Sequence, residues 1–241
     1  MSHTPKHVVI TGGSSGIGLA MTRSLTSKGH RVAVIAQRPE AIFREANPDL
    51  PDVSYIAHDL RDLDGAAERL DEIVAGWDRL DVLVNNAGIK RFEKATDSTA
   101  ESISAHLEVN LAAPIRLSAA AASVMRRQTD GGLIINVASV YGLKPTAELA
   151  SYGASKAGLI HYTRALAAEL ASDGVRANVI CPGAVRTNLM SRAHFNMAER
   201  GVPLGRCQTP EEIADLVGWL MSDFARNITG SVINLDGGMS L

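Results

Sequence analysis

The chain has 241 residues, a length that suits one large α/β domain or at most two small ones. Its 24 Lys and Arg residues nearly balance its 26 Asp and Glu residues, and the resulting formal charge of −2 makes it a poor candidate for nonspecific nucleic-acid binding. Hydrophobic residues make up 46% of the sequence and charged residues 21%, the balance of a globular protein with a substantial core.

Short apolar runs alternate with helical patterns along the whole chain. Apolar residues at the 3-4-3 spacing of one helix face predict helices over 63–77 and 213–220, and Thr209 with Pro210 gives the second helix its start. This alternation predicts βαβ units, and hence one domain over residues 1–241: a three-layer, doubly wound α/β Rossmann fold with a mostly parallel sheet of seven strands. The runs that predict strands are 8–10, 32–35, 53–57, 82–84, 133–137, 175–179 and 232–235.

A glycine-rich turn follows the first predicted strand. Residues 11–18 read Thr-Gly-Gly-Ser-Ser-Gly-Ile-Gly and lead directly into a helical stretch. Glycines let the backbone approach a pyrophosphate, and the N-terminus of the helix presents free N–H groups to it. A tight strand-to-helix turn also needs glycine, but three glycines at this spacing after a first strand predict a dinucleotide site.

The end of the second strand bears on the choice of cofactor. A carboxylate there would bind the ribose 2′-hydroxyl of NAD, but Ala36 and Gln37 occupy the positions and Arg38 follows. A guanidinium can pair with a 2′-phosphate, which favours NADP over NAD, although Arg38 could also be a solvated surface residue. Asp59, after the third strand, lies where an adenine edge is expected or caps the next helix.

Ser139, Tyr152 and Lys156 form the most informative cluster. Ser139 follows a predicted strand, at the edge of the sheet where α/β proteins bind ligands. Tyr152 and Lys156 are four residues apart in a helical stretch and so share one helix face. A nearby ammonium and an oxidised nicotinamide would lower the phenol pKa from about 10, so that the tyrosine can exchange protons with a substrate oxygen near neutral pH.

These motifs resemble those of the short-chain dehydrogenase/reductase family, in its single-domain form of about 250 residues. The resemblance extends over nearly everything from His7 to Leu241. It rests on Thr-Gly-x-x-x-Gly-x-Gly at 11–18, Asn-Asn-Ala-Gly at 85–88, Asn110, Ser139, Tyr-x-x-x-Lys at 152–156 and Pro-Gly at 182–183.

The resemblance implies a role for each catalytic position. Tyr152 would be the general acid/base, and Lys156 would lower its pKa and bind the nicotinamide ribose. Ser139 would orient and polarise the substrate oxygen, while Asn110 would hold a water that links Lys156 to solvent. Thr187 would meet the nicotinamide carboxamide. Cofactor contacts are expected at Gly12, Ser14, Ser15, Gly16, Ile17, Gly18, Arg38, Asp59, Leu60, Asn86, Ala87, Gly88, Tyr152, Lys156, Pro182, Gly183, Val185 and Thr187.

The expected function is NADP(H)-dependent interconversion of a carbonyl and a secondary alcohol, with a ketone or a 3-oxoacyl compound as the substrate. An NAD-dependent alcohol or sugar dehydrogenase is the alternative within the same class. A dinucleotide-binding regulator without catalysis is the alternative from another class, but a pure binder does not need Asn110, Ser139, Tyr152 and Lys156 together. A small-molecule substrate is thus the expected partner.

Cysteine content and terminal composition bear on the compartment. Cys181 and Cys207 are too few for a disulfide framework and are typical of reduced thiols in the cytoplasm. The polar N-terminus lacks the apolar region of a signal peptide, and no window approaches the roughly 20 apolar residues of a membrane span. No His, Cys, Asp or Glu set has metal-ligand spacing. We therefore expect a cytoplasmic protein with no metal, membrane or nucleic-acid partner.

Two further expectations concern assembly and substrate access. Small residues of the Tyr-Lys helix allow close helix packing, and the family resemblance implies a homotetramer, with a dimer as the next choice. The irregular segment 188–205 follows Thr187 and carries apolar residues without a clean period. It is predicted to fold over the substrate as a mobile lid.

Overall fold

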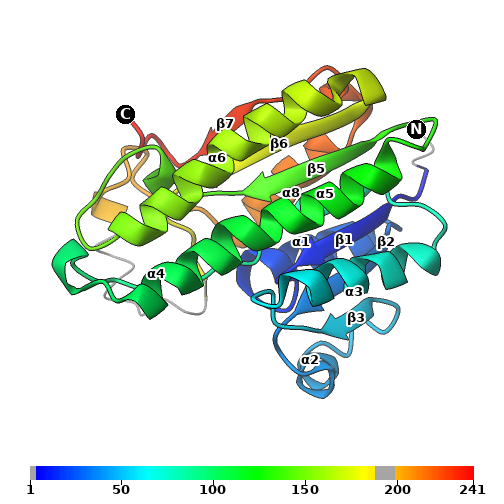
Figure 1. Ribbon diagram of the computed structural model, residues 1–241, viewed down its shortest axis with the longest axis horizontal. Helices are drawn as coiled ribbons and strands as arrows, with labels where there is room; N and C mark the ends of the chain where they lie inside the picture. Colours follow the sequence, from blue (N-terminus) through cyan, green and yellow to red (C-terminus); the bar gives the residue numbers. More distant parts are fainter. Residues whose placement is uncertain (1–3, 188–198) are drawn as a thin grey trace.

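The strands lie where the apolar runs predicted them. The computed structural model describes residues 4–187 and 199–241, and Figure 1 shows one central sheet between layers of helices. Its seven strands are β1 (His7–Thr11), β2 (Arg31–Ala36), β3 (Ser54–Ala57), β4 (Val82–Asn85), β5 (Gly132–Val137), β6 (Val175–Pro182) and β7 (Val232–Leu235).

Helices connect successive strands as the predicted βαβ pattern requires. The predicted helix at 63–77 is observed at Leu63–Ala75 and begins at Asp62, whose side chain accepts a hydrogen bond from Gly65 N–H (3.1 Å). Asp59 is therefore not its N-cap. The helices are α1 (Gly16–Ser27), α2 (Glu40–Ala46), α3 (Leu63–Ala75), α4 (Ala100–Leu107), α5 (Ala113–Met125), α6 (Ala150–Leu170) and α8 (Pro210–Leu220).

The sheet has the strand order β3-β2-β1-β4-β5-β6-β7, and every strand pair in it is parallel. The three-layer doubly wound Rossmann fold is thereby confirmed. Successive strands are added outward from β1 toward one edge of the sheet and outward from β4 toward the other edge. The strand order therefore reverses between β1 and β4. Crossover connections diverge at such a point and leave a crevice at the carboxyl ends of the strands.

Side chains of each strand alternate between two hydrophobic cores. Val8 and Ile10 of β1 face one core with residues of α1 and α8, whereas Val9 between them faces the other with residues of α3, α5 and α6. Figure 1 shows α3, α5 and α6 in front of the sheet and α1 and α8 behind it. The period of two explains why the predicted strands are continuously apolar: both faces are covered.

The predicted lid at 188–205 falls largely outside the described residues, because the structure describes only 199–205 of it. Within that part, Leu204 N–H donates to the carbonyl of Gly237 (3.0 Å), and Val202 is buried. Residues 199–205 therefore pack against the turn that follows β7.

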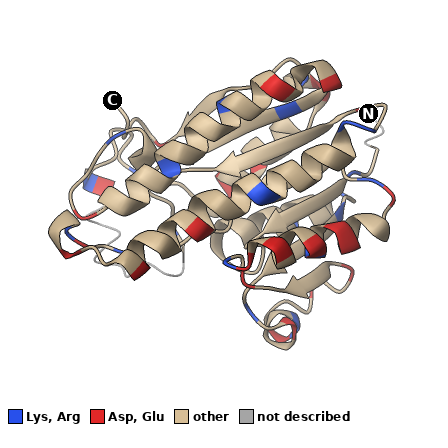
Figure 2. Cartoon of the chain, viewed as in Figure 1, with Lys and Arg blue, Asp and Glu red and all other residues tan. Residues whose placement is uncertain are grey.

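Figure 2 shows that both the basic and the acidic positions are distributed along the chain, on several helices and loops. This distribution agrees with the near-zero net charge of the sequence. Among the described residues, the structure contains no helix with the length and apolar character needed to cross a membrane.

Glu212 in the first turn of α8 provides a test of the fold's electrostatics. Its carboxylate accepts from Thr209 N–H (2.8 Å) and Arg206 (2.9 Å), which lowers its pKa from 4.5 to about 2. A depressed pKa stabilises the fold above the unfolded pKa, and that contribution is lost as the pH falls through the folded value. We expect Glu212→Gln to reduce the free energy of unfolding by about 1 kcal/mol at neutral pH and by less near pH 3, measured by urea denaturation.

Glu211→Gln is the matched control, because Glu211 is the exposed neighbour in the same helical turn. It should have little effect at either pH. A loss of stability in Glu212→Gln that is equal at both pH values would contradict the assignment of the pKa shift.

Candidate active site

The loops after β1 and β4 are hydrogen-bonded to each other at the point where the strand order reverses. The buried Thr11 hydroxyl accepts hydrogen bonds from the backbone N–H groups of Asn86 (3.0 Å) and Ala87 (3.1 Å). Asn86 in turn donates through its side-chain amide to the carbonyl of Thr11 (3.0 Å). A Cβ on Gly12 would lie 2.9 Å from Ala87 Cα, and one on Gly18 would lie 2.2 Å from the carbonyl oxygen of Gly12. Glycine at 12 and 18 is therefore a packing requirement.

The start of α1 faces a cleft of about 620 Å³. Ser15 is the N-cap of α1 but forms no side-chain capping bond, so the first N–H groups of the helix can bind an anion. The cleft has the size and the backbone donors that a dinucleotide requires. Of the predicted cofactor residues, those that line it are Gly12, Ser14, Ser15, Gly16, Ile17, Gly18, Arg38, Asp59, Leu60, Asn86, Ala87, Gly88 and Thr187.

The remaining predicted cofactor residues do not line this cleft. Pro182 ends β6, and Gly183 N–H donates to the carbonyl of Leu235 (3.0 Å). Val185 forms an isolated bridge with Gln208. These residues carry the chain to Thr187, which lies beside the glycine loop: a Cβ on Gly16 would be 3.6 Å from Thr187 Cγ2.

Arg38 turns back toward the glycine loop. Its Nη1 lies 3.4 Å from the carbonyl oxygen of Ser14, and its own carbonyl accepts a hydrogen bond from Tyr55 OH (2.7 Å). Gln37 donates to Asp59 (3.1 Å), whose pKa is lowered by the Arg61 guanidinium that contacts it at 2.9 Å. Of the three arginines that line the cleft, Arg61 is paired with Asp59, whereas no described carboxylate contacts the guanidinium of Arg38 or of Arg91.

Some residues of the cleft were not anticipated from the sequence. Ile89 and Arg91 follow the Asn-Asn-Ala-Gly turn, and their position directly after a strand end is the signal that could have identified them. Ala105 and Val109 come from the segment α4 to η2 (Glu108–Ala112), which no motif marked. The cleft residues outside the prediction are His58, Arg61, Ile89, Arg91, Ala105 and Val109, beside the already discussed Ala36 and Gln37.

Lys156 is buried on α6, next to the cleft. Its ammonium donates to the carbonyl of Val137 at the end of β5 (2.9 Å), and burial lowers its pKa to about 8. A Cβ on Gly88, which lines the cleft, would lie 3.3 Å from Lys156 Nζ and 3.1 Å from Asn110 Oδ1. Lys156 and Asn110 therefore meet the loop after β4 from the α6 side.

Tyr152 lies one turn before Lys156, and its hydroxyl is directed to Ser139. Burial raises the pKa of the Tyr152 phenol, while a hydrogen bond with the Ser139 side chain opposes the increase. Without a bound cofactor, loss of hydration disfavours the phenolate more than its surroundings stabilise it. The lowering of this pKa by Lys156 together with an oxidised nicotinamide stays a prediction. Ser139 also accepts from Tyr141 N–H (3.2 Å), which fixes its side chain at the start of a short 3₁₀ turn.

Asn110 is completely buried in the π-helical turn η2. Its amide donates to the carbonyl of Ile89 (2.9 Å) and to Ser155 Oγ (3.1 Å), and its Oδ1 accepts from Ile89 N–H (2.8 Å). Single π-helical turns are frequent at functional sites because they displace a side chain from the regular helix. Here the turn directs Asn110 between the loop after β4 and α6.

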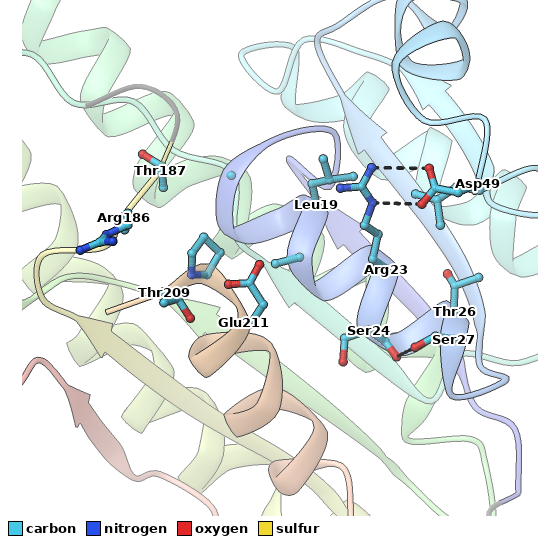
Figure 3. A pocket seen from close by; sticks show the side chains of 14 residues that line it. Leu19, Arg23, Ser24, Thr26, Ser27, Asp49, Arg186, Thr187, Thr209 and Glu211 are labelled. Atoms are coloured by element: carbon cyan, nitrogen blue, oxygen red, sulfur yellow. Dashed lines mark hydrogen bonds and ion pairs between the residues drawn. The ribbon is translucent and has the colours of Figure 1, made fainter. Parts of the chain in front are cut away.

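A second cavity of about 730 Å³ adjoins the cleft between α1 and the start of α8. Figure 3 shows Thr209 and Glu211 on one wall and Leu19 and Arg23 on the other, with Arg23 paired to Asp49 (3.2 Å). Gly16 and Thr187 line both cavities. The second cavity is therefore a lateral extension of the cofactor cleft.

The thiols are poorly suited to nucleophilic catalysis. Cys181 and Cys207 are both free and buried, and burial raises the pKa of Cys181 to about 12. His161 on α6 is exposed. Within residues 4–187 and 199–241, no group of His, Cys, Asp and Glu could hold a metal ion.

Known proteins with similar sequences cover nearly the whole chain. The family model described as enoyl-(acyl carrier protein) reductase matches residues 12–240. The 3-oxoacyl-(acyl-carrier-protein) reductase of Chlamydia muridarum is 33% identical over 243 residues, which is 98% of this chain and 97% of that protein. A putative ketoacyl reductase of the monensin polyketide synthase from Streptomyces virginiae is 35% identical over 254 residues, with the same coverage.

A solved structure shows the same similarity in three dimensions. The 3-ketoacyl-(acyl-carrier-protein) reductase of Brucella melitensis, crystallised with NADH, superposes with a TM-score of 0.91 at 27% identity and covers 98% of both chains. The same fold thus occurs in a reductase that binds a nicotinamide dinucleotide. The chain is an oxidoreductase that interconverts a carbonyl and an alcohol with such a cofactor, and it belongs to the short-chain dehydrogenase/reductase family.

Proposed function

We propose that this chain is an NADPH-dependent ketoreductase that acts on 3-oxoacyl thioesters or small ketones of similar shape. The observation that carries the proposal is the position of Ser139 and Tyr152 at the carboxyl end of β5, next to a cleft with the donors for a dinucleotide. The names of the relatives from Chlamydia muridarum and Streptomyces virginiae support the substrate class.

The electrostatics of the cluster favour proton donation. Since burial raises the Tyr152 pKa above 10, the phenol carries its proton at neutral pH and can give it to the oxygen of a carbonyl that is being reduced. Ser139 holds that oxygen by a second hydrogen bond. The bound cofactor supplies the hydride to the carbonyl carbon. Tyr152 and Ser139 thus define the position of the oxygen.

Lys156 and Asn110 would supply the proton that Tyr152 gives to the substrate oxygen. Lys156, with a pKa of about 8, is mostly protonated at neutral pH and can bind the nicotinamide ribose and return a proton toward Tyr152. Asn110 would hold the water that connects Lys156 to solvent. Thr187, together with Pro182, Gly183 and Val185, would form the end of the cofactor site near the nicotinamide.

The mouth of the cleft favours NADPH. A 2′-phosphate needs cationic donors, and Arg38 beside Ser14 supplies a guanidinium, whereas Ala36 and Gln37 supply no carboxylate for a 2′-hydroxyl. An NAD-dependent alcohol dehydrogenase is the second candidate, because the Brucella melitensis relative was solved with NADH. The charge at Arg38 supports the first.

We further propose a cytoplasmic homotetramer of single-domain subunits. The edge strand β7 leaves Val232, Ile233 and Leu235 only half-buried. On α6, a row of small side chains lies exposed at helical spacing, which would let a second copy approach closely; it comprises Ala154, Ala157, Ala165 and Ala168. Both faces can be covered at once only in an assembly with two kinds of interface.

Tyr152→Phe tests the proton donor. The change keeps the ring and its packing but removes the transferable proton. We expect kcat for NADPH-dependent reduction of an acetoacetyl thioester to fall by at least about a hundredfold, with the Kd for NADPH nearly unchanged. Turnover close to that of the unmodified protein would contradict the assignment of Tyr152, and binding of NADPH without turnover of any ketone would favour a regulator.

Cofactor preference follows from Arg38. A charge-assisted contact is worth roughly 1.5–3 kcal/mol, so we expect kcat/KM for NADPH to exceed that for NADH by at least about tenfold. Arg38→Ala should reduce this ratio and Ala36→Asp should shift it toward NADH. Arg61→Ala, which removes a cleft arginine that is paired with Asp59, is the control and should change the ratio less. Equal values for both cofactors in the unmodified protein would refute the interpretation of Arg38.

Sedimentation velocity tests the assembly. At micromolar concentration we expect a tetramer, and Ala165→Glu, which places a charge in the exposed small-residue row of α6, should yield a smaller species. Ala171→Glu, at the end of the helix and outside that row, is the control. A stable monomer of the unmodified chain would show that these faces do not associate.

A further inference from the structure

His106 is completely buried at the end of α4, and its two ring nitrogens have different partners. Nδ1 lies 2.9 Å from the carbonyl oxygen of Ser102, which can only accept a hydrogen bond. Nε2 lies 3.2 Å from the backbone N–H of Arg91, which can only donate. Nδ1 must therefore carry the proton and Nε2 must be the acceptor, so these contacts fix one neutral tautomer of the ring.

His106 is the middle member of three side chains that bind the segment after β4. Ser102 donates to Glu93 (2.7 Å), His106 accepts from Arg91 N–H, and Asn110 binds both backbone groups of Ile89. The helical residues are four apart, which corresponds to a rise of about 6 Å. Their partners are two apart, which is about 6.6 Å of extended chain. The two spacings match, so we name the segment 89–93 with these three side chains the clamp.

The clamp connects the cofactor cleft with Tyr152. Ile89 and Arg91 line the cleft. On its other side the His106 ring packs edge-on against the Tyr152 ring, with centroids 6.2 Å apart and an interplanar angle of 67°. Asn110 adds a bond to Ser155 on α6, the helix that carries Tyr152. One buried imidazole therefore touches both the wall of the cleft and the proton donor.

We propose that His106 is a positioning residue, which holds the segment 89–93 and the Tyr152 ring in register so that cofactor and proton donor meet the substrate at the right distance. The proposal rests on the role proposed for Tyr152. Its essential feature is the acceptor at Nε2: without it, the Arg91 N–H loses its partner and the clamp depends on Asn110 and Ser102 alone. A displacement of about 1 Å at a reacting centre is enough to reduce turnover strongly.

Paired substitutions separate this role from simple packing. His106→Leu introduces an apolar side chain of similar volume and removes the acceptor. His106→Gln supplies an Oε1 that can take the place of Nε2 toward Arg91 N–H. The same two changes at the exposed His161, which lies between Ala157 and Ala165 on α6, are the matched controls, with sedimentation velocity to verify that the assembly is unchanged. The assay is reduction of an acetoacetyl thioester with NADPH, together with the Kd for NADPH from fluorescence titration.

We expect His106→Leu to lower kcat by at least about tenfold while KM and the Kd for NADPH change less than about threefold, since the clamp positions Tyr152 and not the bulk of the ligands. His106→Gln should recover most of kcat, and both His161 variants should behave like the unmodified protein. Equal losses in His106→Leu and His106→Gln would overturn the proposal, and so would a kcat in folded His106→Leu that matches the unmodified protein.

A second measurement does not depend on turnover. NMR of the protein with nitrogen-labelled histidine should show a neutral ring protonated at Nδ1, assigned by its loss in His106→Gln. The amide of Arg91 should exchange with solvent faster in His106→Leu than in His106→Gln. A ring protonated at Nε2 in the unmodified protein would refute the clamp even if His106→Leu does not fold well enough for kinetics. Equal exchange of the Arg91 amide in the two folded variants would refute it as well. Loss of all activity in Tyr152→Phe with the clamp intact would agree with both proposals. Full activity in Tyr152→Phe would refute the role of Tyr152 and, with it, the positioning role of His106.

Discussion

The hydroxyl of Thr11 joins the two halves of the sheet at the edge where the cofactor cleft lies. It accepts from two consecutive N–H groups, of Asn86 and Ala87, and so fixes the loop after β4 against the loop after β1. Glycine at 12 lets the two backbones approach to a distance that no side chain allows. Because the chain changes direction between β1 and β4, this contact determines the shape of the crevice and the orientation of α1 toward it.

From that contact a continuous series of packed residues leads to Lys156 and Asn110. Gly88 brings the loop after β4 against Lys156 and Asn110, and Asn110 and His106 hold the next residues, Ile89 and Arg91. The price of this close packing is the burial of an ammonium and a phenol, which shifts the Lys156 pKa down and the Tyr152 pKa up. Both shifts follow from lost hydration, which disfavours the charged form of each group, the ammonium of Lys156 and the phenolate of Tyr152, relative to the same group in water.

Much of the molecule could be predicted from the sequence. Apolar β-branched runs such as 8–10 and 133–137 identified strands buried on both faces, and the spacing of Leu63, Leu70 and Trp77 identified a helix. Thr-Gly-x-x-x-Gly-x-Gly at 11–18 located the cleft, and the four-residue spacing of Tyr152 and Lys156 placed both side chains on one helix face. These features depend on neighbours within a few residues, so the period of a strand or a helix makes them recognisable in the sequence.

The sequence by itself determined the fold class, the glycine loop and the identity of the polar cluster. Only the tertiary structure decided which way Arg38 turns, which direction the Tyr152 pKa moves, and which groups His106 contacts. Arg38 contacts Ser14, and His106 contacts Arg91 and Tyr152. The residues of each pair are too far apart in the sequence for the period of a helix or a strand to predict these contacts. The Tyr152 pKa depends on how much water the assembled helices and loops exclude, and hydration is a property of the packed molecule rather than of any segment of its sequence.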